Sequence, residues 1–211
     1  MGEATRILAI RHGQTAWNAD SRIQGHTDIA LDVVGRWQAE RLAVALAGQG
    51  IHAIYSSDLA RARQTAAPLA ALTGLPVHTD IGLRERAFGE FEGLSFAQIE
   101  QRWPEQSARW RRRDPEFGAR GGEVLRAFRE RAVAAVTRLA LAHRGQCIAL
   151  VTHGGVLDLL YRQATRVALD APRSWQVANA SINRLLHSAE GMMLVGWADV
   201  GHLDRARDDP P

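Results

Sequence analysis

Two histidines occupy matching positions at the ends of apolar segments. His12 ends the run ILAIRH and is followed by Gly13, while His153 ends ALVTH and is followed by Gly154 and Gly155. Ligands of open α/β sheets bind at the carboxyl ends of strands, and glycines there let the backbone approach a ligand closely. One such histidine alone would more simply be a capped strand end. Two in matched contexts predict that both imidazoles face one crevice.

Three further charged groups follow strand-like segments. Arg11 precedes His12, Arg61 lies in the first turn of a helix after the strand-like AIYSSD, and Glu85 follows another short apolar segment. Guanidinium groups match the geometry of phosphate oxygens, and an imidazole can attack phosphorus. Together with His153, these groups predict a site for a phosphoryl group. Taken singly, Arg61 could instead form a surface ion pair, and Glu85 could be a solvated carboxylate between two arginines.

The elements that must position these groups alternate between strands and helices. The apolar patterns predict strands over residues 6–10 and 51–58, a turn and then a short strand within 74–78, and, within 147–155, a buried strand followed by two glycines. They predict helices over 31–48, with Asp32 as N-cap, and over 59–72, 123–143 and 156–165. Residues 83–122 read as loop with short helices, 181–188 and 192–200 as a terminal hairpin, and 203–211 as a frayed end.

This alternation argues for an α/β sandwich on a mainly parallel sheet. No internal repeat, linker or break in composition divides the chain, so we expect a single domain over residues 1–211. With 46% apolar residues, the chain can bury a sizeable core.

The composition argues against several other classes of protein. The net charge of +3 is too small to mark a nucleic-acid binder. No apolar run approaches the length of a membrane span, and no secretory signal is visible. The one cysteine, Cys147, excludes an intrachain disulfide and agrees with a reducing compartment. We therefore expect a soluble, cytoplasmic protein. All 26 basic residues are arginine, so every fixed cationic site is a forked guanidinium.

Several motifs resemble those of a known family. They are RHGQTAWN (11–18), SSDLARARQTA (56–66), LRERAFGEFEG (83–93), GGE (121–123) and VTHGG (151–155). In these motifs and in their order, the sequence resembles the histidine phosphatase superfamily, also called the phosphoglycerate mutase-like family. The resemblance implies a three-layer α/β/α sandwich, in which helices flank both faces of a mixed, mainly parallel sheet and the site lies at the strand ends.

The resemblance also implies a mechanism that the residue types support. His12 would attack phosphorus as a neutral imidazole and form a phosphohistidine, its other ring nitrogen bonding a backbone carbonyl. Arg11, Arg61 and His153 would hold the phosphoryl oxygens, His153 as an imidazolium once phosphate is bound. Glu85 would donate a proton to the leaving group and later accept one from water.

The family's supporting positions near the phosphate map onto a further set of residues. They are Gly13, Thr15, Asn18, Gln24, Gly25 and Gly154. We expect no metal and no cofactor, since the arginines supply the positive charge and no metal-binding spacing of histidines or cysteines is present. The six remaining histidines match no family site and are interpreted as structural or surface residues: His26, His52, His78, His143, His187 and His202.

The family contains phosphatases and mutases with the same core. Members that resemble glycolytic mutases carry a long insertion before the second histidine, whereas only 68 positions separate Glu85 from His153 here. Gly155 stands where the mutase pattern has asparagine, and the mutase's lysine has no counterpart. These departures favour a metal-independent phosphomonoester hydrolase, with a cofactor-dependent phosphoglycerate mutase as the alternative.

A non-catalytic protein that binds phosphoryl ligands is the alternative from another class. RNA binding through RWRRRDPEFGAR is disfavoured, because acidic residues interrupt the segment and no wider basic stripe exists. We therefore expect a small-molecule phosphoester as the partner, without nucleic acid or membrane. The oligomeric state stays open, and pairing through the terminal hairpin into a homodimer is one hypothesis.

The physiological substrate is also open, and residues 86–120 are expected to select it. Within this range, Arg111, Arg112 and Arg113 resemble a paired arginine of the mutase insertion. They could reach the pocket and bind a second anionic group of the substrate, with Arg113 as the residue to test. The simpler interpretation is a solvated basic turn.

Overall fold

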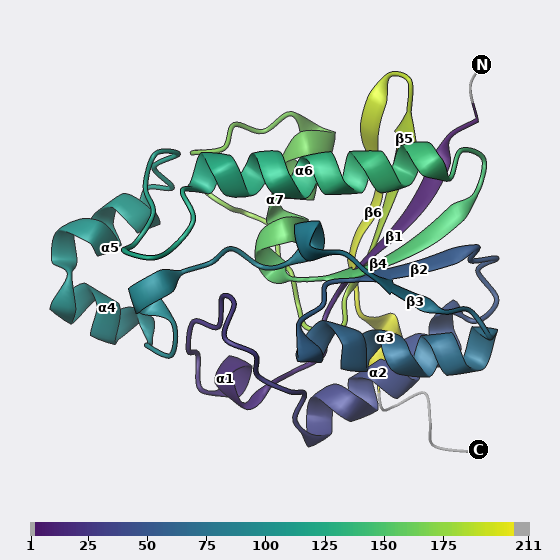
Figure 1. Cartoon of the computed structure of the whole chain (residues 1–211), viewed down its shortest axis with the longest axis horizontal. Coiled ribbons are helices and arrows are strands. Elements are labelled where there is room, and N and C mark those ends of the chain that lie inside the picture. The colour runs from purple at the N-terminus through teal and green to yellow at the C-terminus, as the bar shows by residue number, and fades with distance from the viewer. Residues whose placement is uncertain (1–2, 205–211) are drawn as a thin grey trace.

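One mixed sheet joins all the strands of residues 3–204, the part of the chain that the computed structural model describes. The strands are β1 (Thr5–Arg11), β2 (Ala53–Ser56), β3 (Val77–Thr79), β4 (Cys147–Thr152), β5 (Ile182–Ser188) and β6 (Gly191–Asp199). Their order is β3-β2-β4-β1-β5-β6, in which the first four are parallel and the terminal hairpin β5–β6 is antiparallel (Figure 1). The mixed, mainly parallel sheet is therefore confirmed.

Helices cover both faces of this sheet. The short α1 (Ala16–Ala19) follows β1, α2 (Val33–Leu46) and α3 (Ala60–Thr73) pack on one face, and α6 (Leu125–Ala142) and α7 (Gly154–Thr165) pack on the other (Figure 1). The three-layer α/β/α prediction is confirmed. None of the helices between residues 3 and 204 is long and apolar enough to cross a membrane.

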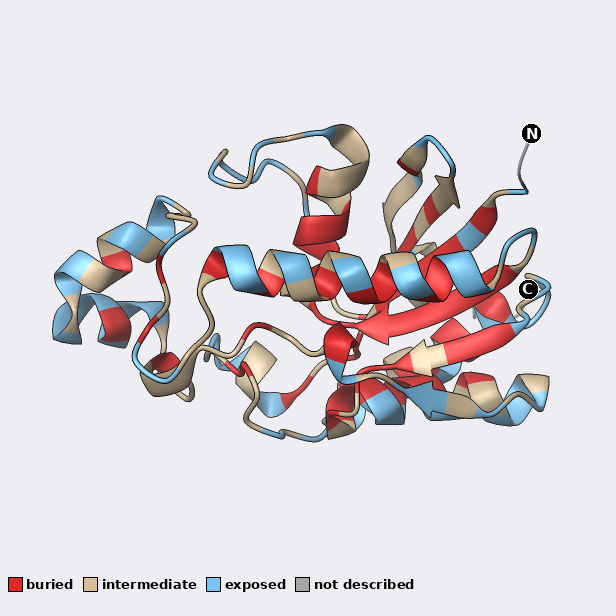
Figure 2. Ribbon diagram, turned by 45° about the horizontal axis from the view of Figure 1, so that its top comes forward, coloured by how far each residue is buried: buried red, intermediate tan, exposed pale blue. Residues whose placement is uncertain are grey.

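The alternation of side chains along β1 explains the two layers of core. Ile7 and Ala9 point into the cluster beneath α6 and α7, whereas Leu8 and Ile10 point into the cluster beneath α2 and α3. All four are at most 5% exposed, so β1 is buried on both faces, as expected of a strand inside a parallel sheet. Figure 2 shows the buried residues gathered on the sheet and on the inward sides of the helices.

A small lobe projects from the end of the sheet that carries the strand carboxyl ends. It contains α4 (Phe96–Arg102) and α5 (Pro104–Arg111) and lies at the left of Figure 1. The lobe has a separate apolar cluster around Phe91, Ile99 and Phe117. Short 3₁₀ turns at Ile81–Leu83 and Gly89–Phe91 lead into it, and a third lies at Gly201–Leu203. The prediction of loop with short helices for residues 83–122 is confirmed.

Several predicted boundaries were wrong by one or two residues. The strand predicted over 51–58 is limited to Ala53–Ser56, the final parallel strand ends at Thr152, before His153, and α7 begins at Gly154 instead of residue 156. His153 itself is the extended N-cap of α7, so the chain passes from strand to helix without a loop. The predicted turn and short strand within 74–78 are confirmed, since Gly74 at φ +71° closes α3 in the left-handed conformation and β3 begins at Val77. The predicted frayed end falls mostly outside the described residues.

Asp32 should contribute measurably to stability. Its side chain accepts a hydrogen bond from Gly35 N at 2.7 Å at the start of α2 and another from Gln14 Nε2 at 3.0 Å. Asp32→Ala removes both bonds, and we expect it to lower the free energy of unfolding by about 1–2 kcal/mol. Urea denaturation measures this loss. Glu40→Ala, on the exposed side of the same helix, should change it by less than about 0.5 kcal/mol, and equal losses in the two variants would contradict the capping role.

Candidate active site

The pairing of β1 with β4 brings the two histidines together. The parallel register sets Arg11 opposite Thr152, and the next residue, His12, donates from its backbone nitrogen to Thr152 O at 2.9 Å. The imidazole rings of His12 and His153 consequently lie with their centroids 5.1 Å apart and tilted by 58°. The two strand ends that matched in sequence thus share one crevice.

His12 is oriented and charged as a nucleophile requires. Its Nδ1 lies 2.7 Å from the Gly13 carbonyl oxygen, to which it donates as Nδ1–H, so the lone pair resides on Nε2. Burial lowers the pKa of His12 well below 6.5, and the neighbouring guanidiniums of Arg61 and Arg11 lower it further. The ring is therefore neutral near pH 7.

Arg61 is fully buried and is held in place by three hydrogen bonds. From the first turn of α3 it donates to Gly25 O at 2.7 Å, to Thr27 O at 3.0 Å and to His153 Nδ1 at 3.3 Å. Three of its five N–H groups are thus used and two are left for a ligand. Burial is the main cause that lowers its pKa, yet a guanidinium stays charged.

The contact with Arg61 decides the tautomer of His153. Because Nδ1 accepts, the proton resides on Nε2, which is buried and has no partner among the described residues. Burial, then Arg61, lowers the pKa of His153 well below 6.5. We expected an imidazolium with bound phosphate. A protonated ring would carry an N–H on Nδ1 as well, and this donor would face the donating N–H of Arg61. The structure favours a neutral imidazole that can donate from Nε2.

Arg11 and Gln24 present further polar atoms without partners. Arg11 donates from Nη1 to Val177 O, while its Nε is buried with no partner between residues 3 and 204. Burial lowers the pKa of Arg11 to about 10, which leaves it charged at neutral pH. The buried Gln24 Oε1 is equally unpaired. Buried polar groups are ordinarily paired, so this concentration of unpaired atoms indicates a place for a polar ligand.

Glu85 reaches the site from the segment after β3. Its carboxylate accepts from Gly155 N at 2.9 Å and from Arg86 N at 2.8 Å. A Cβ at position 155 would come within 2.0 Å of Glu85 Oε1. Glycine at position 155 therefore lets the acid approach the start of α7, which gives Gly155 a role in positioning Glu85.

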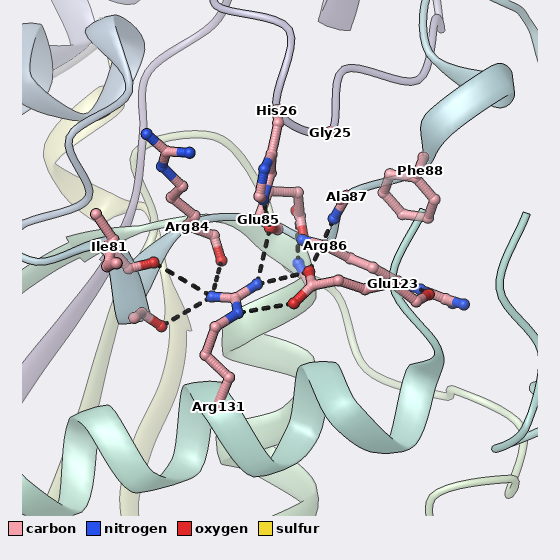
Figure 3. Close-up of polar contacts among 12 residues, drawn as sticks. Gly25, His26, Ile81, Arg84, Glu85, Arg86, Ala87, Phe88, Glu123 and Arg131 are labelled. Carbon is pink, nitrogen blue, oxygen red and sulfur yellow. Dashed lines mark hydrogen bonds and ion pairs between the residues drawn. The ribbon is translucent and has the colours of Figure 1, made fainter. Parts of the chain in front are cut away.

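A partly buried arginine holds the backbone that carries Glu85. Arg131 on α6 donates to the carbonyl oxygens of Gly82 at 3.0 Å, of Arg84 at 3.1 Å and of Glu85 at 3.1 Å (Figure 3). Its guanidinium also pairs with the Glu123 carboxylate at 2.7 Å, and Glu123 accepts from Ala87 N at 2.9 Å. One planar cation thus fixes the segment on both sides of the acid.

His26 fixes the same segment from the opposite side. Its Nε2 lies 2.8 Å from the Glu85 carbonyl oxygen, to which it donates (Figure 3). Its backbone nitrogen donates to Glu92, which also accepts from Thr27 N and Phe88 N. His26 is structural, as predicted, but its contact with Glu85 makes it part of the site.

The supporting candidates divide into two groups. Asn18, Gln24, Gly25 and Gly154 line the cavity, together with Arg11, His12, Arg61 and Glu85. Gly13 and Thr15 do not line it. A Cβ at Gly13 would meet Gly35 O at 2.5 Å, so this glycine serves the packing of α2 and not the approach of a ligand.

Thr15 caps α1 and so orients Asn18. Its hydroxyl oxygen accepts from Asn18 N at 3.2 Å, while Asn18 Oδ1 accepts from Thr15 N at 3.1 Å. Asn179 Nδ2, which sequence reasoning missed, donates to Asn18 Oδ1 at 3.2 Å and to His12 O at 3.0 Å. Asn18 thus has its oxygen occupied and its amide nitrogen left for a ligand.

The cavity has a volume of about 270 Å³ and extends outward from the histidines. Seven further residues line it that the sequence gave little reason to select, which are Arg22, Ile23, Phe88, Phe96, Trp110, Arg173 and Val177. Three of these seven fall in the range 86–120 that we expected to select the substrate.

The arginine run of α5 does not reach this cavity. Arg113 donates to Leu169 O at 2.9 Å and pairs with the buried Asp158 on α7, and Arg111 pairs with Glu100 on the surface. Arg112 ends α5, and none of the three lines the pocket. The hypothesis that they bind the substrate was wrong, because the lobe turns them toward α7 and toward solvent. Within residues 3–204 no group of three acidic, histidine or cysteine side chains is placed to hold a metal ion.

Comparison with known proteins decides the family. The histidine phosphatase superfamily (branch 1) matches residues 7–200. The chain belongs to the histidine phosphatase superfamily. The resemblance that the motifs indicated is therefore confirmed over nearly the whole chain.

Relatives within the superfamily include proteins named for both activities. Phosphoglycerate mutase-like protein 4 of Arabidopsis thaliana is 39% identical, over 94% of this chain and 86% of that protein. A metal-independent phosphoserine phosphatase of the same plant is 34% identical, over 95% and 84%. Among solved structures, a mycobacterial glucosyl-3-phosphoglycerate phosphatase complexed with VO₃ has a TM-score of 0.82 at 33% identity, over 91% and 98%. The predicted class, a phosphatase of this superfamily, is confirmed.

The protonation of the two histidines is directly measurable. Because their pKa values lie well below 6.5, both rings should stay neutral at about pH 6.5, where an ordinary histidine is half protonated. They should gain a proton only at much lower pH. A nuclear magnetic resonance titration of the imidazole nitrogens, assigned with His12→Asn and His153→Asn, tests this. Midpoints near pH 6.5 for both rings would contradict the described electrostatics.

Proposed function

We propose that this protein hydrolyses phosphomonoesters without a metal, through a phosphohistidine at His12. One observation carries the proposal. The Nε2 lone pair of His12 is left free by the bond from Nδ1 to Gly13 O. Unpaired buried donors lie nearby, on Arg11, which lines the same cavity, and on His153, whose ring centroid is 5.1 Å from that of His12. Such an arrangement binds a tetrahedral oxyanion and presents a neutral nucleophile to its phosphorus atom.

In the first step, His12 Nε2 attacks phosphorus and the bond to the ester oxygen breaks. The electron pair leaves on the alcohol oxygen, to which Glu85 gives its proton. Arg11, Arg61 and the neutral His153 donate to the three phosphoryl oxygens. Their fixed hydrogen bonds stabilise the charge that develops on those oxygens.

In the second step, water replaces the alcohol. Glu85 takes a proton from it, the oxygen attacks phosphorus, and the bond to Nε2 breaks with its electron pair returned to the ring. Inorganic phosphate leaves and His12 is neutral again. The position of Glu85 against Gly155 N serves both steps, since the acid of the first is the base of the second.

Hydrolysis is favoured over phosphoryl transfer between sugar acids. Only the 3₁₀ turn Gly89–Phe91, α4 and α5 lie between Glu85 and the segment that leads to α6, and Arg111 and Arg113 are engaged elsewhere. A mutase must keep water from its phosphohistidine, whereas this lobe leaves the cavity open at Arg22 and Arg173, both exposed. A cofactor-dependent mutase is the second candidate, favoured by the relative named as mutase-like.

Within the same proposal, the enzyme is cytoplasmic and acts on a small-molecule phosphoester without nucleic acid or membrane. Its one cysteine, Cys147, is free and buried, which fits a reducing compartment. A homodimer through the edge of β6 and a single domain over the whole chain stay predictions.

Hydrolysis of p-nitrophenyl phosphate in the presence of EDTA tests the proposal. We expect turnover that EDTA does not reduce and that His12→Asn abolishes while phosphate analogues still bind. Absence of turnover with every phosphoester tried would favour the non-catalytic binder. Isomerisation of phosphoglycerate, primed with 2,3-bisphosphoglycerate, that outpaces phosphate release would favour the mutase.

Arg131 should act on the acid step through Glu85. Loss of its bonds to the carbonyls of residues 82, 84 and 85 should misplace Glu85. An alkyl phosphate needs the acid for its alkoxide, and p-nitrophenyl phosphate needs it little. Arg131→Met should therefore lower kcat/KM about tenfold more for β-glycerophosphate than for p-nitrophenyl phosphate. Arg131→Lys, which keeps the charge without the planar fork, should fall between.

Arg138→Met is the matched control. Arg138 lies on the same side of α6 and pairs with Asp80, but it is largely exposed, and its contacts within residues 3–204 include no bond to the carbonyl oxygens of residues 82, 84 and 85. We expect kcat/KM for both substrates to stay near that of the unaltered protein. If Arg131→Met lowers both values by the same factor, its role is in folding and not in the position of the acid.

A further inference from the structure

The outer half of the cavity carries more positive charge than a phosphoryl group requires. Arg11 and Arg61 lie at its inner end, beside the histidines, and Arg22 and Arg173 lie at its mouth. Glu85 is the one acidic side chain among the residues that line it. A phosphoryl dianion is matched by the inner pair, so the outer pair is left facing the part of the substrate that departs as alcohol.

Neither outer arginine is neutralised by a strong ion pair. Arg22 lies 3.6 Å from Asp20, and both side chains are about half exposed, which makes this pair weak. Arg173 has no carboxylate partner between residues 3 and 204 and is exposed. Its charge is close enough to Arg11 to contribute to the lowered pKa of that guanidinium, after the larger effect of burial. The two side chains are therefore free to meet an anion.

An aromatic wall stands beside Arg22. Phe96 and Trp110 stack with ring centroids 4.9 Å apart and planes 11° apart, and Phe88 lies against Trp110 at 5.5 Å. Phe96 is 57% exposed although it is a large apolar side chain. Since it fills no core, an exposed flat ring at the mouth of a cavity is suited to contact with an apolar or planar ligand.

Backbone hydrogen bonds hold this wall and Arg22 next to each other. Arg22 forms an antiparallel bridge with Ser95, the N-cap of α4. Ile23 N donates to Leu94 O at 2.9 Å, and Gly93 N donates to Ile23 O at 2.8 Å. Because Phe96 follows Ser95 directly, these backbone bonds hold Arg22 and Phe96 together at one edge of the cavity.

We propose that this edge, together with Arg173 of the same cavity, is a subsite for the leaving group, and that the preferred substrate is a phosphomonoester whose alcohol carries both a ring and a second anionic group. The inference rests on the proposed function, since it describes the alcohol that the phosphohistidine step releases. Arg22 and Arg173 bind the second anion, and Phe96 packs against the ring.

Three phosphoesters separate the two parts of this subsite. Phenyl phosphate has the ring alone, 3-phosphoglycerate has the second anion alone, and 4-carboxyphenyl phosphate has both. Arg22→Gln and Arg173→Gln should each raise KM roughly tenfold for the two carboxylates and leave KM for phenyl phosphate unchanged. Phe96→Ser, at an exposed position, should raise KM for the two aryl phosphates and leave that for 3-phosphoglycerate unchanged.

Arg111→Gln is the control, since Arg111 is exposed on the same lobe, pairs with Glu100 and does not line the cavity. It should alter none of the three values. Equal changes for phenyl and 4-carboxyphenyl phosphate in the arginine variants would overturn the subsite while the phosphatase stands. Failure of the unaltered protein to hydrolyse any of the three would overturn the proposed function itself.

Discussion

The parallel pairing of β1 with β4 is the constraint on which the site depends. A register that sets Arg11 opposite Thr152 leaves His12 and His153 as the first residues beyond the paired strands. A shift by one residue would exchange the faces of the sheet to which their side chains belong. Because the apolar residues of both strands are packed on both faces, such a shift would also disrupt the close packing of both cores. The packing of the sheet therefore fixes the geometry of the catalytic residues.

Burial then sets the charge states of the residues that this register brings together. Two guanidiniums and two imidazoles lie close together in a buried site, and the imidazoles give up their protons because they titrate more easily than arginine. The guanidiniums keep their charge for binding, while each neutral ring has one free role: His12 offers the lone pair of Nε2 and His153 offers the N–H of Nε2. Burial therefore leaves two of the four nitrogen bases charged and two neutral.

The residues around the two histidines could be predicted from the sequence, whereas most of the residues at the entrance of the cavity could not. Arg11, His12, Arg61, Glu85 and His153 could be selected because each follows a strand-like segment, and strands impose direction on the residue that comes next. Arg22, Arg173 and Asn179 lie in irregular segments, whose path depends on distant contacts such as the bridge from Arg22 to Ser95. The three arginines at positions 111–113 suggested a substrate contact because they are adjacent in sequence. The end of α5, however, directs them away from the cavity. Arg131 was hidden inside an amphipathic helix, where an arginine ordinarily faces solvent.

The lobe of α4 and α5 has an apolar cluster that shares no residue with the clusters of the two sheet faces. Substitutions inside this cluster can therefore change the shape of the cavity entrance with little effect on the packing of the two cores beside the sheet. The catalytic groups lie at the strand ends of the sheet, whereas Phe96 and Trp110 of the cavity lie in the lobe. Substitutions within a segment of some twenty residues, Phe91–Trp110, can therefore change which substrates are preferred while the catalytic residues stay unaltered.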